Sequence, residues 1–116
     1  MKLLRFGPPG REKPGIVDKA GVIRDLSSVV PDITGATLAA GAIAKIRKVK
    51  PETLPAVRKG VRIGPCVGGV GNFIAIGLNY VDHAKETGAA IPKEPIVVNK
   101  APNCIVGPND SVMIPR

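Results

Sequence analysis

Residues 77–86, with the sequence Gly-Leu-Asn-Tyr-Val-Asp-His-Ala-Lys-Glu, decide how the second half of this chain is interpreted. They contain the only histidine and the only tyrosine among the 116 residues. The run before them, residues 72–78, is short, apolar and bounded by glycines, which favours a buried strand over a helix. A short helix after this strand would place His83 and Glu86 on one face. The segment therefore predicts a strand, a turn and a short helix that carries a candidate acid–base pair.

The histidine has two interpretations when only its spacing is considered. A single histidine beside a strand is more often a packed or surface residue than a catalytic one. A histidine with an acid three residues later on a helix can also share a water molecule or a substrate proton. Spacing alone leaves both interpretations open.

Three sequence patches lie in a fixed order over the second half of the chain: GLNYVDHAKE at 77–86, EPIVVNKA at 94–101 and IVGPND at 105–110. They resemble the fumarylacetoacetate hydrolase family, in which "GLNYxxHAxE", "EPxxxxK", "GPxD" and a strand ending in proline mark the entry into the catalytic domain. Residues 1–10 look like the start of bacterial members that carry a small N-terminal domain. The resemblance thus spans nearly the whole chain.

The resemblance implies an enzyme of the ureidoglycolate lyase-like or acylpyruvate hydrolase-like kind. Members cleave or rearrange 2-oxo acids and related compounds, including acylpyruvates, ureidoglycolate and ring-fission products of aromatic catabolism. Mg²⁺, or Mn²⁺ or Ca²⁺ in its place, chelates the substrate, polarises its carbonyl and stabilises the enolate that develops. Hydrolases, lyases, isomerases and decarboxylases share this scaffold, and the sequence does not choose among them.

The same resemblance assigns roles to individual residues. His83 matches the general base that activates water, and Glu86 matches its acidic partner, which orients the imidazole. Family members carry this pair on a mobile lid, for which residues 87–90 supply a flexible exit. Tyr80 and Lys100 match substrate-binding positions. Lys100 could hold a substrate carboxylate or form a structural salt bridge, and both alternatives stay open.

The metal ligands of the family are a Glu-x-Glu pair and a later aspartate, all beyond the position that matches Pro115. The acids of this chain stand at 12, 18, 25, 32, 52, 82, 86, 94 and 110, so none are two residues apart on one strand. We expect no complete metal centre in this chain and little or no turnover by it alone. Asn99 and residues 102–103 also depart from the family pattern, so the substrate pocket is expected to differ.

The net charge of +8 raises the alternative of a basic nucleic-acid-binding domain. Residues 1–70 hold 13 Lys and Arg against 5 Asp and Glu, while residues 71–116 hold 4 against 4. The densest basic segments, 45–50 and 58–62, contain no aromatic side chain that could stack on bases. A solvated helix face is therefore favoured over nucleic-acid binding.

The fold class expected is α+β, with a small mixed α/β domain at 1–70 and the first strands of a mixed β-sandwich roll at 71–116. The first domain is predicted to contain strands at 2–6, 15–19 and 22–26, a helix at 37–46 and a short helix from Pro51 to near Gly60. The second is predicted to contain strands at 73–78, 95–100, 104–106 and 111–114, with a turn at 107–110 between the last two. The glycine-rich stretch 60–71 is interpreted as a connection rather than a phosphate-binding loop, because no Lys-Ser/Thr follows it.

Cys66 and Cys104 are far apart in sequence and are expected to be buried small hydrophobes, with neither a disulfide nor a zinc site. The chain has no apolar run of about 18 residues and no signal-peptide pattern, so a cytoplasmic protein without membrane insertion is expected. A homodimer is expected of the parent enzyme. A non-catalytic module that assembles with a partner chain is the alternative to the enzyme.

Overall fold

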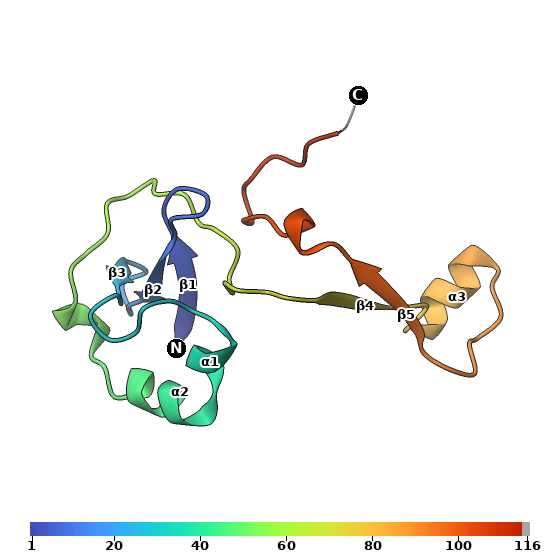
Figure 1. Cartoon of the computed structure of the whole chain (residues 1–116), viewed down its shortest axis with the longest axis horizontal. Helices are drawn as coiled ribbons and strands as arrows, with labels where there is room; N and C mark the ends of the chain where they lie inside the picture. The colour runs from blue at the N-terminus through green and yellow to red at the C-terminus, as the bar shows by residue number, and fades with distance from the viewer. Residues whose placement is uncertain (115–116) are drawn as a thin grey trace. The chain divides into compact units, whose positions relative to one another are not determined.

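The computed structural model describes residues 1–114, and its helices and strands form an α+β fold, as the sequence predicted (Figure 1). The chain divides into two compact units. The first contains residues 1–70 and also the described part of 105–116, and the second contains residues 71–104. The sequence-based division placed all of 71–116 in one domain, whereas residues 105–114 pack with the first unit.

The first unit is built on an antiparallel sheet of three strands in the order β1 (Lys2–Phe6), β2 (Lys13–Val17) and β3 (Ile23–Asp25). Leu3 pairs with Ile16, and Ile16 pairs with Arg24. β2 ends before the predicted residue 19 because Asp18 begins a turn. One carboxylate oxygen of Asp18 accepts hydrogen bonds from the backbone N–H groups of Ala20 and Val22, at 2.9 and 2.8 Å.

Both edges of this sheet are covered by one later segment of the chain. Asp25 N–H donates to Pro55 O and Val57 N–H donates to Ile23 O, so residues 55–57 follow the edge at β3. Residues 62–64 follow the edge at β1, where Phe6 bridges Ile63. The stretch 60–71, predicted to be a connection, thus begins as part of the sheet's border. Covered edges leave fewer backbone groups open to another strand.

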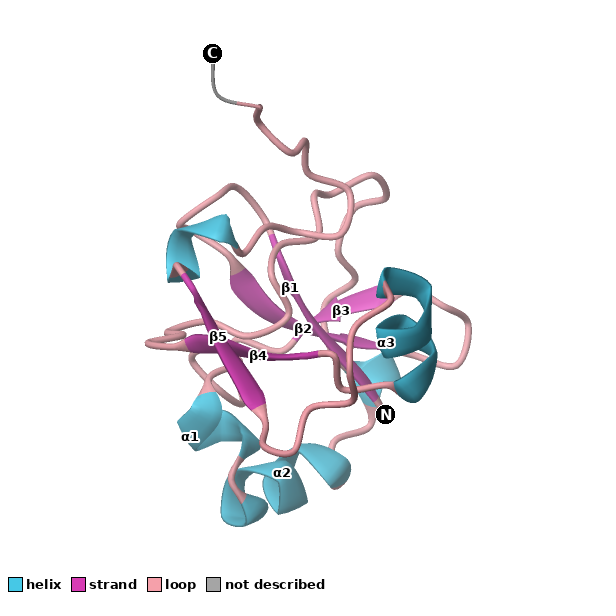
Figure 2. Cartoon of the chain, turned by 90° about the vertical axis from the view of Figure 1, so that its right-hand side faces the viewer, coloured by secondary structure: helices cyan, strands magenta, loops and turns pink. Residues whose placement is uncertain are grey.

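Two short helices, α1 (Gly35–Leu38) and α2 (Ala40–Arg47), lie side by side where one helix was predicted at 37–46 (Figures 1 and 2). The helix breaks at Ala39, whose ψ of 152° is extended. Thr37 and Ile46 are both buried, but nine residues of continuous helix would place them on opposite sides, about 180° apart. The break lets both reach the interior, where the Thr37 hydroxyl donates to Asp32 O at 2.6 Å.

The hydrophobic core of the first unit gathers side chains from the sheet, the following loop and α2. Its buried members are Ile16, Leu26, Val30, Ile33 and Ile46, with Leu3, Val49 and Leu54 packed against them. The predicted helix from Pro51 to Gly60 is wrong beyond its first turn, because only a 3₁₀ turn, Pro51–Thr53, forms. Leu54 precedes Pro55 and is extended, as steric contact with the proline ring requires.

The second unit is a two-stranded antiparallel hairpin, with β4 (Phe73–Gly77) paired to β5 (Ile96–Lys100) and α3 (Val81–Thr87) between them. α3 lies near the turn end of the hairpin (Figure 1). These three elements confirm the strand, turn and helix predicted around residues 77–86. The expectation that the strand is buried is wrong, because most of β4 is exposed in the structure. Strands predicted at 104–106 and 111–114 are wrong, because Pro102–Cys104 forms a 3₁₀ turn and no neighbouring strand pairs with these segments in residues 1–114.

The two cysteines were expected to be buried, and this expectation is wrong. Both Cys66 and Cys104 are exposed and free. Cys66 directly follows Pro65 in a loop, and Cys104 is the last residue of the 3₁₀ turn Pro102–Cys104. Neither cysteine belongs to the hydrophobic core.

Candidate functional site

The turn between β4 and α3 is set by an unusual backbone conformation. Leu78 has a φ of 45°, the single positive value among the described residues other than glycine. L residues with side chains rarely adopt this region, and such positions cost about 1–3 kcal/mol and cluster at functional sites. The next residues, Asn79 and Tyr80, lead into α3, where Asp82 in the first turn and Lys85 in the last turn complement the helix dipole.

The end of α3 is fixed rather than loose. Gly88 adopts a left-handed φ of 66° and caps the helix with its backbone N–H. The Thr87 hydroxyl donates to His83 O at 2.9 Å and to Ala84 O at 3.2 Å. They add to the backbone hydrogen bonds of the helix end, where Ala84 O also accepts from Ala89 N–H at 2.9 Å.

His83 and Glu86 both lie on α3 with exposed side chains. Their spacing places them on one face of the helix. No hydrogen bond or ion pair joins the His83 imidazole to the Glu86 carboxylate within residues 1–114. The pair is thus brought to one surface, but the contact that would orient the imidazole is not made.

A cleft of about 420 Å³ lies beside α3, between the end of β4 and the loop 91–95. From the helix, Val81 and Ala84 line it, and Lys93 and Glu94 line it from the loop. His83 and Glu86 each stand two positions after one of the cleft-lining helix residues, a rotation of about 200° around the helix axis. The candidate catalytic pair therefore faces away from the cleft, toward solvent.

The other two predicted site residues lie apart from one another. Tyr80 precedes the first residue of α3, and its side chain is 75% exposed. Lys100 pairs with Phe73, at the end of the hairpin opposite to Gly77 and Ile96. Four residues of strand separate these two ends, about 13 Å. Tyr80 is thus close in sequence and helix position to the pair, whereas Lys100 lies at the far end of the hairpin.

No group of three or more histidine, cysteine, aspartate or glutamate side chains that could hold a metal ion occurs among residues 1–114. Asp82, Glu86 and Glu94 supply carboxylates in the second unit, and only Glu94 lines the cleft. A divalent cation such as Mg²⁺ requires several converging oxygen ligands. The described residues therefore do not fit a metal centre.

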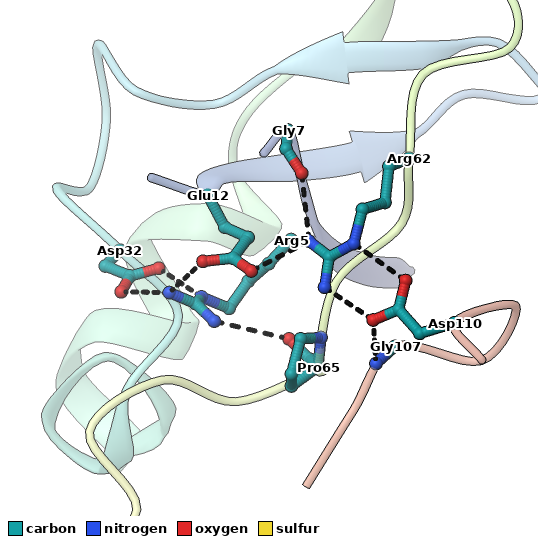
Figure 3. A network of polar contacts seen from close by, with 8 residues as sticks. All are labelled: Arg5, Gly7, Glu12, Asp32, Arg62, Pro65, Gly107 and Asp110. Carbon is teal, nitrogen blue, oxygen red and sulfur yellow. Dashed lines mark hydrogen bonds and ion pairs between the residues drawn. The ribbon is translucent and has the colours of Figure 1, made fainter. Parts of the chain in front are cut away.

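A polar cluster that the sequence did not predict lies in the first unit (Figure 3). Arg5 donates to both carboxylate oxygens of Asp32, at 2.7 and 3.0 Å. Glu12 lies between two guanidinium groups, 3.6 Å from Arg5 and 2.9 Å from Arg62. Arg62 also donates to both oxygens of Asp110, with 2.7 Å between Nε and Oδ1. The five side chains form one continuous network of ion pairs.

The charges of this network shift the pKa values of its acids. The hydrogen bond from Arg62, followed by that from the Gly107 backbone N–H, lowers the pKa of Asp110 below its usual value. Burial raises the pKa of Glu12, but the Arg62 hydrogen bond and the charge of Arg5 act against it, and the net shift is downward. The paired carboxylates raise the pKa of Arg62. Glu12, Asp110 and Arg62 are therefore held in their charged forms at neutral pH.

This network explains the "GPxD" patch as a structural feature. The Asp110 carboxylate accepts a hydrogen bond from Gly107 N–H at 2.7 Å, closing the turn that the sequence predicted at 107–110. A Cβ at Gly107 would lie 2.2 Å from Ile63 O. The turn is thus packed directly on the strand-edge segment and fixed there by Arg62. Asp110 of the motif was visible in the sequence, but no sequence pattern indicated that its partner is Arg62, 48 residues earlier.

The predicted solvated face is confirmed for the basic residues 45–50, in and just after α2, but not for Arg62, which is partly buried in ion pairs. Lys45, Arg47, Lys48 and Lys50 are all exposed, while Ile46 between them is fully buried.

Helices able to cross a membrane are absent from the described residues, because none is long and apolar enough.

The chain is similar over all 116 residues to proteins of several Burkholderia species that are named "Putative hydrolase". It is 58% identical to one from Burkholderia cenocepacia strain J2315 and 57% identical to others from Burkholderia orbicola and Burkholderia multivorans. The chain spans 41% of the length of these relatives. No protein-family model matches the chain.

Proposed function

We propose that this chain is part of a hydrolase of the fumarylacetoacetate hydrolase type, which acts on a 2-oxo acid or a related compound. The observation that carries the proposal is the pair His83 and Glu86 on the outward face of a short helix that directly follows β4. The names of the relatives support hydrolysis as the reaction class. The three motif patches support the choice of family.

In this proposal His83 is the general base. Its neutral imidazole accepts a proton from water as the water attacks the substrate, and Glu86 stabilises the imidazolium that forms. A base must approach within about 2.6–3.2 Å of the atom whose proton it takes. Because both side chains are exposed and not yet bonded to each other, we propose that they become ordered when substrate and the rest of the enzyme cover this face of α3. Tyr80, which directly precedes α3, would also contact the substrate.

The Mg²⁺, Mn²⁺ or Ca²⁺ ion implied by the resemblance would take its ligands from outside residues 1–114, in the part of the relatives that the match does not cover. Lys100 would bind a substrate carboxylate only if other parts of the enzyme bring substrate to its end of the hairpin. A homodimer and a cytoplasmic location belong to the same proposal. So do the candidate substrates, namely acylpyruvates, ureidoglycolate and ring-fission products of aromatic catabolism.

The test is an assay of the full-length parent enzyme with Mg²⁺ on acylpyruvates, oxaloacetate and ureidoglycolate. Removing a positioned general base is expected to lower kcat by about 10²–10⁴-fold, so His83→Ala should show a loss of that size. Glu86→Gln should show a smaller loss. Lys85→Ala, an exposed change on another face of α3, is the matched control and should retain activity. Full activity of His83→Ala would contradict the role proposed for His83.

A non-catalytic assembly module is the second candidate, favoured by the large exposed apolar side chains of the second unit. It predicts that the chain binds a partner without any hydrolysis by the resulting complex. Turnover by a complex that contains this chain, lost in His83→Ala, would decide for the enzyme.

A further inference from the structure

The hairpin of β4 and β5 is apolar on both of its faces. Directly paired residues share a face, so Ile76 and Val97 lie on one face and Ala75 and Val98 on the other. An antiparallel hairpin with one face in water normally alternates apolar and polar residues. The strand sequences Phe-Ile-Ala-Ile-Gly and Ile-Val-Val-Asn-Lys do not alternate. They have instead the composition of strands that are buried on both sides.

In the structure neither face is buried. On the first face Ile74, Ile76 and Val97 are 58%, 43% and 64% exposed. On the second face Phe73, Ile96 and Val98 are 40%, 43% and 38% exposed. Contiguous apolar surface of this kind marks an interaction site in proteins that are otherwise folded. An isolated two-stranded hairpin is also only marginally stable in water.

We infer that this hairpin is an interaction surface whose two faces are covered by the polypeptide that fills the remaining length of the relatives. The 116 residues match those relatives at 58% identity over the whole chain but cover 41% of their length. The uncovered length is thus longer than the chain itself and is large enough to supply a layer on each face. This inference concerns assembly and holds whichever reaction the parent catalyses.

A second copy of the chain fits this surface less well. Two copies related by a two-fold axis contact one another through the same patch on each. Such a contact would cover one face of each hairpin and leave the other face in water. A longer polypeptide can contribute separate segments to the two faces and can pair with the free edges of both strands.

The first test is reconstitution from two pieces. The 116-residue chain is refolded together with the part of the Burkholderia cenocepacia relative that lies outside the match, supplied as a separate polypeptide. We expect a 1:1 complex by size-exclusion chromatography with light scattering. In that complex the backbone amides of β4 and β5 should exchange hydrogen at least about 100-fold more slowly than in the chain alone. Absence of a complex, or a complex without this protection, overturns the inference.

The second test places a charge on each face separately. Val97→Asp probes the face with Ile76, and Val98→Asp probes the face with Ala75. Burying an unpaired carboxylate is costly, so each variant should weaken the complex at least about tenfold. Leu38→Asp in α1 is the matched control, since Leu38 is 42% exposed in the first unit, and it should leave the affinity unchanged.

Two results of these experiments would overturn the inference in favour of other occupants. If Val97→Asp or Val98→Asp alone has no effect, only one face is covered. If the 116-residue chain by itself forms a dimer in which the same amides are already protected, a second copy is the occupant. The hydrogen exchange of β1 to β3, followed in every variant, shows that loss of binding does not come from unfolding of the first unit.

Discussion

Arg62 and Asp110 lie 48 residues apart in the sequence and form a two-point ion pair, in which Nε and Nη2 of the arginine each donate to one carboxylate oxygen. This pair attaches the turn 107–110 to the rest of the first unit. Arg62 also donates to Gly7 O and Glu12, so one guanidinium group connects three separate segments of the chain. Bidentate arginine–carboxylate pairs of this type add geometric specificity as well as energy.

Asp110→Asn is expected to loosen the turn 107–110 without unfolding the sheet. The amide keeps one acceptor oxygen but cannot form the charged two-point contact with Arg62. Hydrogen exchange at the Gly107 amide, which donates to the Asp110 carboxylate, should become faster, while exchange in β1 and β2 stays the same. Asp82→Asn, a change of the same type at an exposed position of α3, should leave Gly107 unaffected. Unchanged exchange at Gly107 in Asp110→Asn would contradict the proposed attachment.

Acid should destabilise the first unit through Asp110. The Arg62 hydrogen bond keeps its pKa in the folded chain below the value of about 3.9 that it has when unfolded. The unfolded chain therefore binds a proton more readily, so the stabilisation is complete above that value and is lost as pH falls through the folded pKa. Thermal denaturation at a series of pH values below about 5 should show a steeper loss of stability in the wild type than in Asp110→Asn. Equal slopes would exclude this contribution.

Gly107→Ala should destabilise the first unit by about 1–3 kcal/mol, the usual cost of overpacking. A Cβ at this position would lie 2.2 Å from the backbone oxygen of Ile63, which cannot move away without disturbing the segment beside β1. Gly71→Ala is the matched control, because no atom lies within 4 Å of the corresponding Cβ. Urea denaturation of both variants measures the difference. Equal stability would mean that the turn is not packed on Ile63 in solution.

Ile46→Ala should destabilise the first unit by about 2–5 kcal/mol, because it leaves a cavity in the core. Ile46 has no exposed surface, although its neighbours Lys45 and Arg47 on the same helix are exposed. Leu38→Ala at an exposed site of α1 should change the stability by no more than about 0.5 kcal/mol. Chemical denaturation followed by circular dichroism compares the two. A small effect of Ile46→Ala would show that α2 does not pack on the sheet.

The elements that could be predicted from the sequence are those whose signals are local. β4 and α3 follow from an apolar run bounded by glycines and from the polar residues after Tyr80, and the turn 107–110 follows from its Gly-Pro-Asn-Asp sequence. These segments adopt the conformation that their own residues favour. The spacing of His83 and Glu86 likewise predicted a shared helix face.

The features that could not be predicted depend on partners distant in the sequence. Thr37 and Ile46 are both buried only because the helix breaks at Ala39. Packing in the core, rather than the alanine-rich sequence, determines this break. The path of residues 55–64 decides which arginine binds Asp110, and no local sequence pattern predicts that path. The spacing of the candidate pair likewise does not determine whether it faces the cleft or solvent.

Residues 55–64 cover both edges of the three-stranded sheet, whereas β4 and β5 pair only with each other among the described residues. The risk of aggregation in this chain is therefore concentrated in one hairpin. Recombinant material should be most prone to form insoluble β-rich deposits through residues 73–77 and 96–100, and co-expression with a covering polypeptide should raise its solubility more than any change in the first unit.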